Sequence, residues 1–294
     1  MKHVCVLLAA LLAMTSALAD DDGVPRRGYA GLSVFANAGT VWADGTNANF
    51  YSGRPDNVNT ILRVLHSETY GTQIWNDLKN SGLISDAVGN YSQLTVSEYP
   101  EMYYRTSWQI GLGIRYDYES GFGWLLRFDM MRLRATGAFN LSSTNGTGIL
   151  SGNHQYIRCG MLGKEDRINI DLALTRTVDL GGNLCLELDL GLNLNNAKVK
   201  ENLMEINGST YSILDVWNGQ SPSSSTGSYE YVNQGGLGWG VFMSGLVGYR
   251  IEGMGAIKAG YTCYHTKTNL KGYNSWGWHH SLFVRFEINN FSFF

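Results

Sequence analysis

Residues 184–194 read LCLELDLGLNL, and this stretch decides the fold. Leucine occupies every even position, while Glu187, Asp189 and other polar or small residues fill the odd positions. An amphipathic helix would group its apolar residues at intervals of three and four, whereas a β-strand has a side-chain period of two. If residues 184–194 form a β-strand, all six leucines therefore lie on the same face. A strand that is apolar on one face and polar on the other is typical of a transmembrane barrel wall. A soluble antiparallel sheet with one buried face gives a similar pattern. The rest of the chain therefore has to distinguish a transmembrane barrel from a soluble sheet.

The same alternation recurs along the chain and predicts eight strands. They lie near residues 29–42, 107–117, 124–130, 168–175, 184–194, 237–251, 257–263 and 281–288. The predicted connections alternate between short ones near 119–121, 179–183 and 252–255 and long ones over 43–102, 140–166, 196–236 and 267–277. Outer-membrane barrels show this asymmetry, with short periplasmic turns and long external loops. We therefore predict an all-β fold, an eight-stranded antiparallel transmembrane β-barrel. A secreted soluble sandwich is the alternative, but the chain has too little other apolar sequence to cover eight such faces.

The first residues indicate export. An apolar run over residues 4–14 follows the charged Lys2, and the small residues 17–19 provide a cleavage site. The sequence thus predicts a signal peptide over 1–19 and an outer-membrane β-barrel over 20–294. The alternative, an anchor helix, needs an apolar run of roughly 20 residues.

Composition excludes several functions. Removing Lys2 with the signal peptide leaves 21 of the 22 basic residues against 25 acidic ones, and no basic block occurs, so no nucleic-acid partner is expected. Cleavage also leaves three cysteines, Cys159, Cys185 and Cys263, an odd number without a CxxC pair. We interpret them as isolated thiols and predict no metal site and no cofactor.

The strand period assigns side chains to the two faces of the wall. The predicted lipid-facing residues include Leu184, Leu186, Leu188, Leu190, Leu192, Trp108, Ile110, Leu112 and Ile114. The predicted inward-facing charges are Arg115, Asp117, Arg127, Asp129, Asp171, Glu187, Asp189, Arg250, Lys258, Arg285 and Glu287. The interior of an eight-stranded barrel is only wide enough for side chains to fill it. Five cations opposite six anions therefore predict a paired network that plugs the lumen, with a narrow ion path as the alternative.

The strand pattern over about residues 28–42 and 102–290 resembles the eight-stranded OmpA/OmpX-like outer-membrane barrels. The segments NFYSGRPDNVNTILRVL (49–65) and FDMMRLRATGAFNL (128–141) are similar to barrels of Bacteroidota. One group of these accompanies the type IX protein secretion machinery, beside its ring of periplasmic subunits. The resemblance implies a non-enzymatic protein of the bacterial outer membrane, in contact with its lipid, that is an accessory or anchoring subunit of an envelope assembly. Periplasmic ring subunits are then the expected partners. No functional residue is transferred, because the group offers no motif to match.

A lipid-hydrolysing enzyme is another alternative, since His279 and Ser281 share the inward face and His280 points outward. No carboxylate can be assigned to orient either imidazole, so we predict no catalytic residue.

The long first loop, residues 43–102, contains helical spacing. We expect Asp56 to cap one helix, Gly71 to interrupt it, and a second short helix to end near Gly82. Their apolar sides give a candidate partner surface of Val58, Ile61, Leu62, Leu65, Ile74, Trp75 and Leu78. The alternative is that the two helices pack on each other and cover the barrel mouth.

A serine-rich stretch at 221–225, in the third long loop, fits an exposed tip. A surface adhesin that acts through its loops is therefore a further alternative to an anchoring subunit, as is a small channel.

Overall fold

A computed structural model describes residues 30–85, 88–144, 156–215 and 233–289. The predicted signal peptide, 1–19, and the serine-rich stretch, 221–225, lie outside these ranges.

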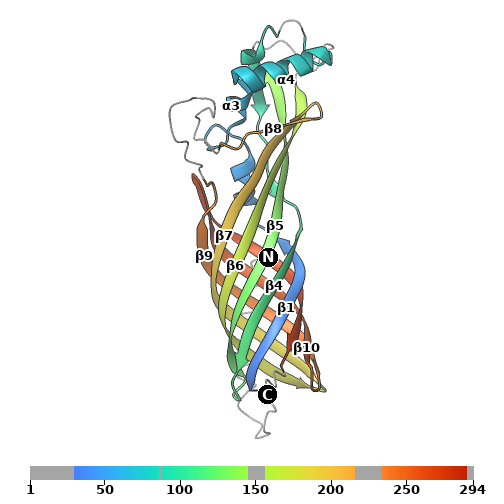
Figure 1. Ribbon diagram of the computed structural model, residues 1–294, viewed down its shortest axis with the longest axis vertical. Coiled ribbons are helices and arrows are strands. Elements are labelled where there is room, and N and C mark those ends of the chain that lie inside the picture. The colour runs from blue at the N-terminus through green and yellow to red at the C-terminus, as the bar shows by residue number, and fades with distance from the viewer. Residues whose placement is uncertain (1–29, 86–87, 145–155, 216–232, 290–294) are drawn as a thin grey trace.

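Eight strands form a closed antiparallel barrel (Figure 1). They are β1 (Gly31–Trp42), β4 (Ser107–Asp117), β5 (Phe122–Ser143), β6 (Ile157–Gly181), β7 (Leu184–Ile206), β9 (Leu237–Ile251), β10 (Gly255–Leu270) and β11 (Tyr273–Ile288). Each strand pairs with its neighbour in the chain order, and pairing of β1 with β11 closes the ring. The predicted fold class is confirmed.

The outer wall carries a continuous apolar band. Across β5, β6 and β7, outward side chains stand in rows: Leu126, Leu172 and Leu192 form one row, and Phe128, Ile170 and Leu194 form the next. Most of these large apolar side chains are exposed. Leu112, for example, is 65 % exposed on β4. A closed barrel pairs its backbone groups internally, so this wall is suited to hydrocarbon.

One predicted lipid-facing residue is covered. Leu188 has the outward parity of the leucine series but is only 2 % exposed. Its register partner on β6 is Arg176, whose long side chain is also directed outward. Outward neighbours of this size shield a leucine, so Leu188 does not contact lipid as predicted. Of the other predicted lipid-facing residues, Leu186 and Ile114 are half-buried, and the rest are exposed. The exposed ones are Leu184, Leu190, Leu192, Trp108, Ile110 and Leu112.

The two ends of the barrel differ. At one end the strands are joined by tight turns in which Gly121, Asn183 and Gly253 have positive φ. At the other end β5, β6 and β7 continue well beyond the remaining strands and form a projecting arm (Figure 1). The loops predicted over 140–166 and 196–236 were therefore wrong in their bounds, because much of each is strand. The loop predicted over 267–277 is instead a tight hairpin between β10 and β11, with Gly272 at φ 72°.

The polarity of the alternation reverses where the arm leaves the barrel. On β5, outward Met130 is followed by outward Arg132, while inward Asp129 is followed by buried Met131 and Leu133. An apolar exterior suits lipid around the lower half of these strands, and a polar exterior suits water around the arm.

Shorter elements pack on the arm and form with it a unit that we call the head. They are α2 (Gly45–Ala48), η1 (Asn49–Tyr51), α3 (Ile61–Leu65), α4 (Glu68–Asn80), η2 (Tyr91–Gln93), β2 (Leu94–Glu98), β3 (Tyr103–Tyr104) and β8 (Ser209–Ser212). The head has its own apolar core, to which the arm contributes Phe139, Met161 and Met204. Among the described residues, none of the helices has the length and apolar character needed to cross a membrane.

The two helices predicted in the first loop exist, but their bounds differ from the prediction. Thr60, not Asp56, caps α3, because its hydroxyl accepts from the Arg63 backbone N–H. Ser67 caps α4, and Gly71 lies inside this helix. Glycine is required there because a Cβ would lie 2.1 Å from the Leu65 carbonyl oxygen.

Replacing Gly71 by alanine should destabilise the head. Alanine in a helix interior normally stabilises by about 1 kcal/mol relative to glycine. Here the added methyl would force α4 away from the end of α3, and overpacking of this kind costs about 1–3 kcal/mol. Protease cleavage of the head under native conditions should accelerate for Gly71→Ala and not for the exposed helix substitution Asn76→Ala. Slower cleavage of Gly71→Ala would contradict the contact.

Candidate functional site: a filled lumen and an external head

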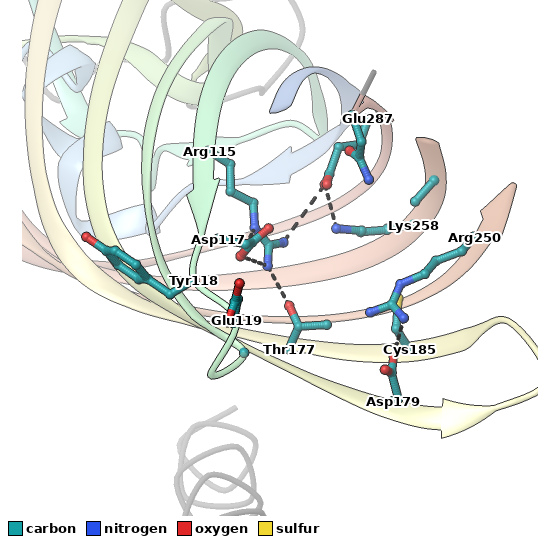
Figure 2. A pocket seen from close by; sticks show the side chains of 13 residues that line it. Arg115, Asp117, Tyr118, Glu119, Thr177, Asp179, Cys185, Arg250, Lys258 and Glu287 are labelled. Carbon is teal, nitrogen blue, oxygen red and sulfur yellow. Dashed lines mark hydrogen bonds and ion pairs between the residues drawn. The ribbon is translucent and has the colours of Figure 1, made fainter. Parts of the chain in front are cut away.

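Charged side chains cross the lumen near the end with the tight turns. Glu187 of β7 is fully buried and accepts from Arg115, Arg285 and Lys258, the last at 2.6 Å. Lys258 also donates to Glu287 at 2.5 Å. Figure 2 shows this mouth of the barrel, where Arg115, Lys258 and Glu287 converge from β4, β10 and β11. Each cation thus has at least one carboxylate partner, which offsets the cost of burying charge.

The same mouth holds four further polar side chains, Asp117, Thr177, Arg250 and Asp179. Arg115 donates to Asp117 at 2.7 Å and to Thr177 at 2.5 Å. Arg250 pairs with Asp179 at the edge of the mouth rather than within the central cluster (Figure 2). Of these, Thr177 and Asp179 were not among the predicted site residues. A hollow of about 40 Å³ lies between these groups.

A second cluster fills the middle of the lumen. Arg127 donates to Asp171 at 2.6 Å and forms an ion pair with Asp129 at 2.9 Å. Asp171 also accepts from Tyr264 at 2.9 Å and from Asn193 at 2.6 Å. All five side chains are buried. The two neutral donors, Tyr264 and Asn193, were missed by a sequence search confined to charges.

Aromatic rings pack against the lumenal cations. The Arg127 guanidinium lies 5.1 Å from the Phe242 ring centroid, and that of Arg285 lies 4.3 Å from the Phe35 centroid. Asp189 is fully buried, and its nearest cation is Arg285 at 3.6 Å. Above the Arg127 cluster there is a hollow of only about 10 Å³, roughly the space of one water molecule. The lumen is therefore packed with side chains along its length.

The filled lumen should not conduct ions. Purified protein reconstituted in a planar lipid bilayer should give no steady single-channel currents, because a packed eight-stranded interior has no water-filled path. A sixteen-stranded porin in the same bilayer provides the positive control. Reproducible current steps that depend on protein concentration would contradict the packing described here.

A third polar cluster closes the lumen beneath the head. Tyr51 of η1 donates to Glu165 at 2.7 Å, and Arg167 donates to the other oxygen of the same carboxylate at 2.6 Å. Arg167 also contacts Nε2 of His279 at 3.4 Å. The Tyr51 ring sits against Gly163, where a Cβ would lie 2.3 Å from the ring. These contacts fasten the first loop to the arm.

The Tyr51 hydroxyl should make the head sensitive to alkali. Burial, reinforced by the Glu165 carboxylate, raises the pKa of Tyr51 well above its ordinary value of 10.0. The unfolded chain loses this proton at about pH 10 and the folded chain does not. Stability should therefore be unaffected below about pH 10 and fall as the pH rises above it. Near-ultraviolet circular dichroism should show the head opening at a higher pH in Tyr51→Phe than in the parent chain; an unchanged opening pH would contradict a buried neutral Tyr51.

The adjacent histidines and serine do not form a nucleophile–base pair. Nδ1 of His279 accepts from the Asp44 backbone N–H at 3.2 Å, and His280 contacts the Tyr261 hydroxyl at 2.5 Å. The buried hydroxyl of Ser281 has no hydrogen-bond partner in the part of the chain that the structure describes. The contact that the hydrolase alternative requires between histidine and serine is thus missing here.

The candidate partner surface of the first loop is turned inward. Ile61, Leu65, Ile74 and Leu78 are fully buried in the head core, and Leu62 and Trp75 pack against it. Val58 is half-buried next to Gly272. These side chains do not form a free apolar surface, because the arm of β5, β6 and β7 already covers them. A partner would have to bind other faces of the head.

Cys159, Cys185 and Cys263 are buried and form no disulfide. Within the described ranges, no group of three or more histidine, cysteine, aspartate or glutamate side chains is arranged to hold a metal ion.

No protein-family model and no curated protein sequence matches the chain. Among solved structures it is similar to neisserial surface protein A, with 10% identity over 88% of this chain and 97% of the other, at a TM-score of 0.41. It is also similar to Ail, the attachment invasion locus protein of Yersinia pestis, with 10% identity over 87% and 99% of the two chains and a TM-score of 0.29. The outer membrane protein OprG from Pseudomonas aeruginosa gives 9% identity, coverages of 89% and 98%, and a TM-score of 0.35.

The fold assignment rests on this chain's own strand pairing and not on those likenesses. Eight paired strands, an apolar outer band and a packed polar interior describe a barrel that only a membrane can accommodate. The chain has the fold of a membrane-spanning eight-stranded β-barrel.

Proposed function

We propose that this barrel is a non-enzymatic scaffold that holds a rigid head outside the membrane, where the head binds a protein partner. The observation that carries the proposal is the continuity of β5, β6 and β7, which run from the apolar band into the head without interruption. Short turns of bacterial outer-membrane barrels face the periplasm, and this supports an external position for the arm and the head.

Contacts between the first loop and the segments that follow β8 and precede β9 favour a rigid head. Arg63 of α3 forms an ion pair with Asp215 at 2.7 Å and donates to the Ile213 carbonyl at 2.8 Å. Asn59 and Gln234 exchange hydrogen bonds through their side-chain amides at 2.7 and 3.0 Å. A preorganised surface loses less conformational entropy on binding, which favours recognition of a macromolecular partner.

Exposed aromatic side chains on the head give the partner a point of contact. Tyr70 is 50 % exposed on α4, and tyrosine is enriched in protein interfaces. The filled lumen below offers no route for a solute. A binding function therefore explains the head and is compatible with the filled lumen, whereas a transport function is not.

A finer hypothesis is that the assembly is the type IX protein secretion machinery and that the partners include its periplasmic ring. This hypothesis rests only on the resemblance of segments 49–65 and 128–141 to such barrels of Bacteroidota. A periplasmic ring would have to bind at the end with the tight turns, where Met254 is 66 % exposed. The two hypotheses therefore place the partner at opposite ends of the molecule, one at the head and the other at the tight turns.

Site-specific photo-crosslinking in cells tests both. A photoreactive residue at Tyr70 samples the head, and one at Met254 samples the opposite end with comparable exposure. We expect a defined adduct from position 70 and none from position 254. Adducts with periplasmic ring subunits from position 254 alone would overturn binding by the head and support anchoring of the type IX machinery.

A further inference from the structure

The outer wall changes from apolar to basic immediately above the lipid-facing band. On β5, β6 and β7 the last row of the band is Met130, Ile168 and Asn196. The next row outward is Arg132, Asp166 and Lys198, and the row after it contains Arg134, Lys164 and Glu201. Lys200 lies beside them and contacts Asp166 at 3.4 Å. We call these two rows, with Lys200, the basic rows.

The basic rows concentrate positive charge in a chain that is negative overall. They hold five cationic side chains and two carboxylates, which gives a net charge of +3 against −3 for the whole chain. Arg132 forms an ion pair with Asp166 at 2.8 Å, and Lys164 forms one with Glu201 at 2.7 Å. Arg134 and Lys198 are exposed and have no ion-pair partner within the described ranges. Two cations are thus available to an external anion.

A groove joins the basic rows to the apolar band. Its volume is about 200 Å³, and it is lined by Trp108, Met130 and Ile168 from the band and by Arg132 and Lys198 from the basic rows. One side of the groove therefore suits an acyl chain and the other suits an anionic group. A ligand that satisfies both sides must be amphipathic.

We propose that the basic rows and this groove bind a phosphorylated lipid of the outer leaflet, with its phosphate on Arg134 and Lys198 and its acyl chain against Trp108 and Met130. Strands rise about 3.4 Å per residue and are tilted by roughly 35–45° in such barrels, so each successive row stands about 5 Å higher. The polar headgroup layer is roughly 5–8 Å thick on each side. The first basic row lies within that layer, and the second lies just beyond its outer edge.

The position of the rows favours a lipid over a soluble anion. Free phosphate would gain nothing from the apolar side of the groove, whereas a lipid already present in the leaflet has its phosphate at this height. A basic side chain beside an anionic membrane surface contributes favourably to lipid binding. Guanidinium groups in addition match the geometry of phosphate oxygens.

The test compares lipid binding by variants of the full chain folded in zwitterionic detergent micelles. Arg134→Gln with Lys198→Gln removes the two unpaired cations and leaves every ion pair of the rows in place. Arg54→Gln with Arg176→Gln removes the same charge elsewhere, on the head and at the opposite rim of the barrel. The probes are a diphosphorylated acylated glucosamine disaccharide, its dephosphorylated form and inorganic phosphate, with bound lipid counted by native mass spectrometry.

The Kd for the phosphorylated lipid should rise about tenfold or more in the basic-row variant and stay within about twofold in the control. The dephosphorylated lipid should bind all three proteins equally weakly. An unchanged Kd in the basic-row variant would overturn the proposal, and so would inorganic phosphate binding as tightly as the lipid. If the double variant does not fold, the single variants and the salt dependence of binding by the parent chain decide. Lipid binding that does not weaken with salt would exclude an electrostatic site.

Discussion

Replacing Glu187 by glutamine should lower the free energy of unfolding of the barrel by about 3–5 kcal/mol. The substitution keeps the shape of the side chain but leaves Arg115, Lys258 and Arg285 with one fewer negative charge at the centre of the lumen. The side chain is fully buried, so water cannot replace the lost partner. Reversible urea unfolding of the protein in lipid vesicles, followed by tryptophan fluorescence, measures the change.

Two variants make the Glu187 result interpretable. Asp179→Asn removes the partner of Arg250 at the more exposed edge of the mouth, where an ion pair contributes at most about 1 kcal/mol. Glu187→Gln combined with Lys258→Gln removes a cation along with the carboxylate and should recover part of the loss. If Glu187→Gln cost no more than Asp179→Asn, the central role assigned to Glu187 would be wrong.

Replacing Ile74 by alanine should destabilise the head by about 2–5 kcal/mol and leave the barrel intact. Ile74 is fully buried on α4 in the head core, which is separate from the small apolar cluster inside the barrel. The cavity left by the missing atoms should promote local opening of the head. Native-state proteolysis within α4 reports that opening, and heat-modifiable migration in gel electrophoresis reports the barrel.

Gln73→Ala, an exposed substitution one residue earlier on α4, is the matched control and should leave both readouts unchanged. Loss of heat-modifiable migration in Ile74→Ala would show that the head and the barrel unfold as one unit, contrary to the separation of their cores.

The period-two pattern predicted the membrane-spanning part of the fold well, because lipid on one side and a polar interior on the other impose a strict alternation. The strand predicted over 237–251 coincides with β9 (Leu237–Ile251). The arm was missed because the search followed apolar residues on the outer face, and that face becomes polar at Arg132. One local signal could have revealed it. Asn207 and Gly208, with φ of 50° and 78°, form the tight turn between β7 and β8, and Asn-Gly is a strong hairpin indicator.

The lumenal site was predictable in its composition but not in its pairing. Strand parity indicated that Arg115 and Glu187 face inward, yet they are 72 residues apart and meet only because the barrel closes. The role of Tyr264 as a donor to Asp171 was invisible in a list of charges. In the first loop, helical spacing located α3 and α4 approximately. It could not show that their apolar sides face the arm, because the arm itself was not anticipated.

The construction of the head from distant segments of the chain has a consequence for biogenesis. The hydrogen bond from Arg63 to the Ile213 carbonyl joins residues 150 positions apart, so the head draws on both early and late segments of the chain. With the head on the external side, as proposed, those segments lie on the far side of the bilayer from the site of insertion and can meet only after the intervening strands have been threaded across. A protease-resistant head on the cell surface would therefore report completed assembly of the barrel, because a half-inserted chain lacks the strands on which the head is built.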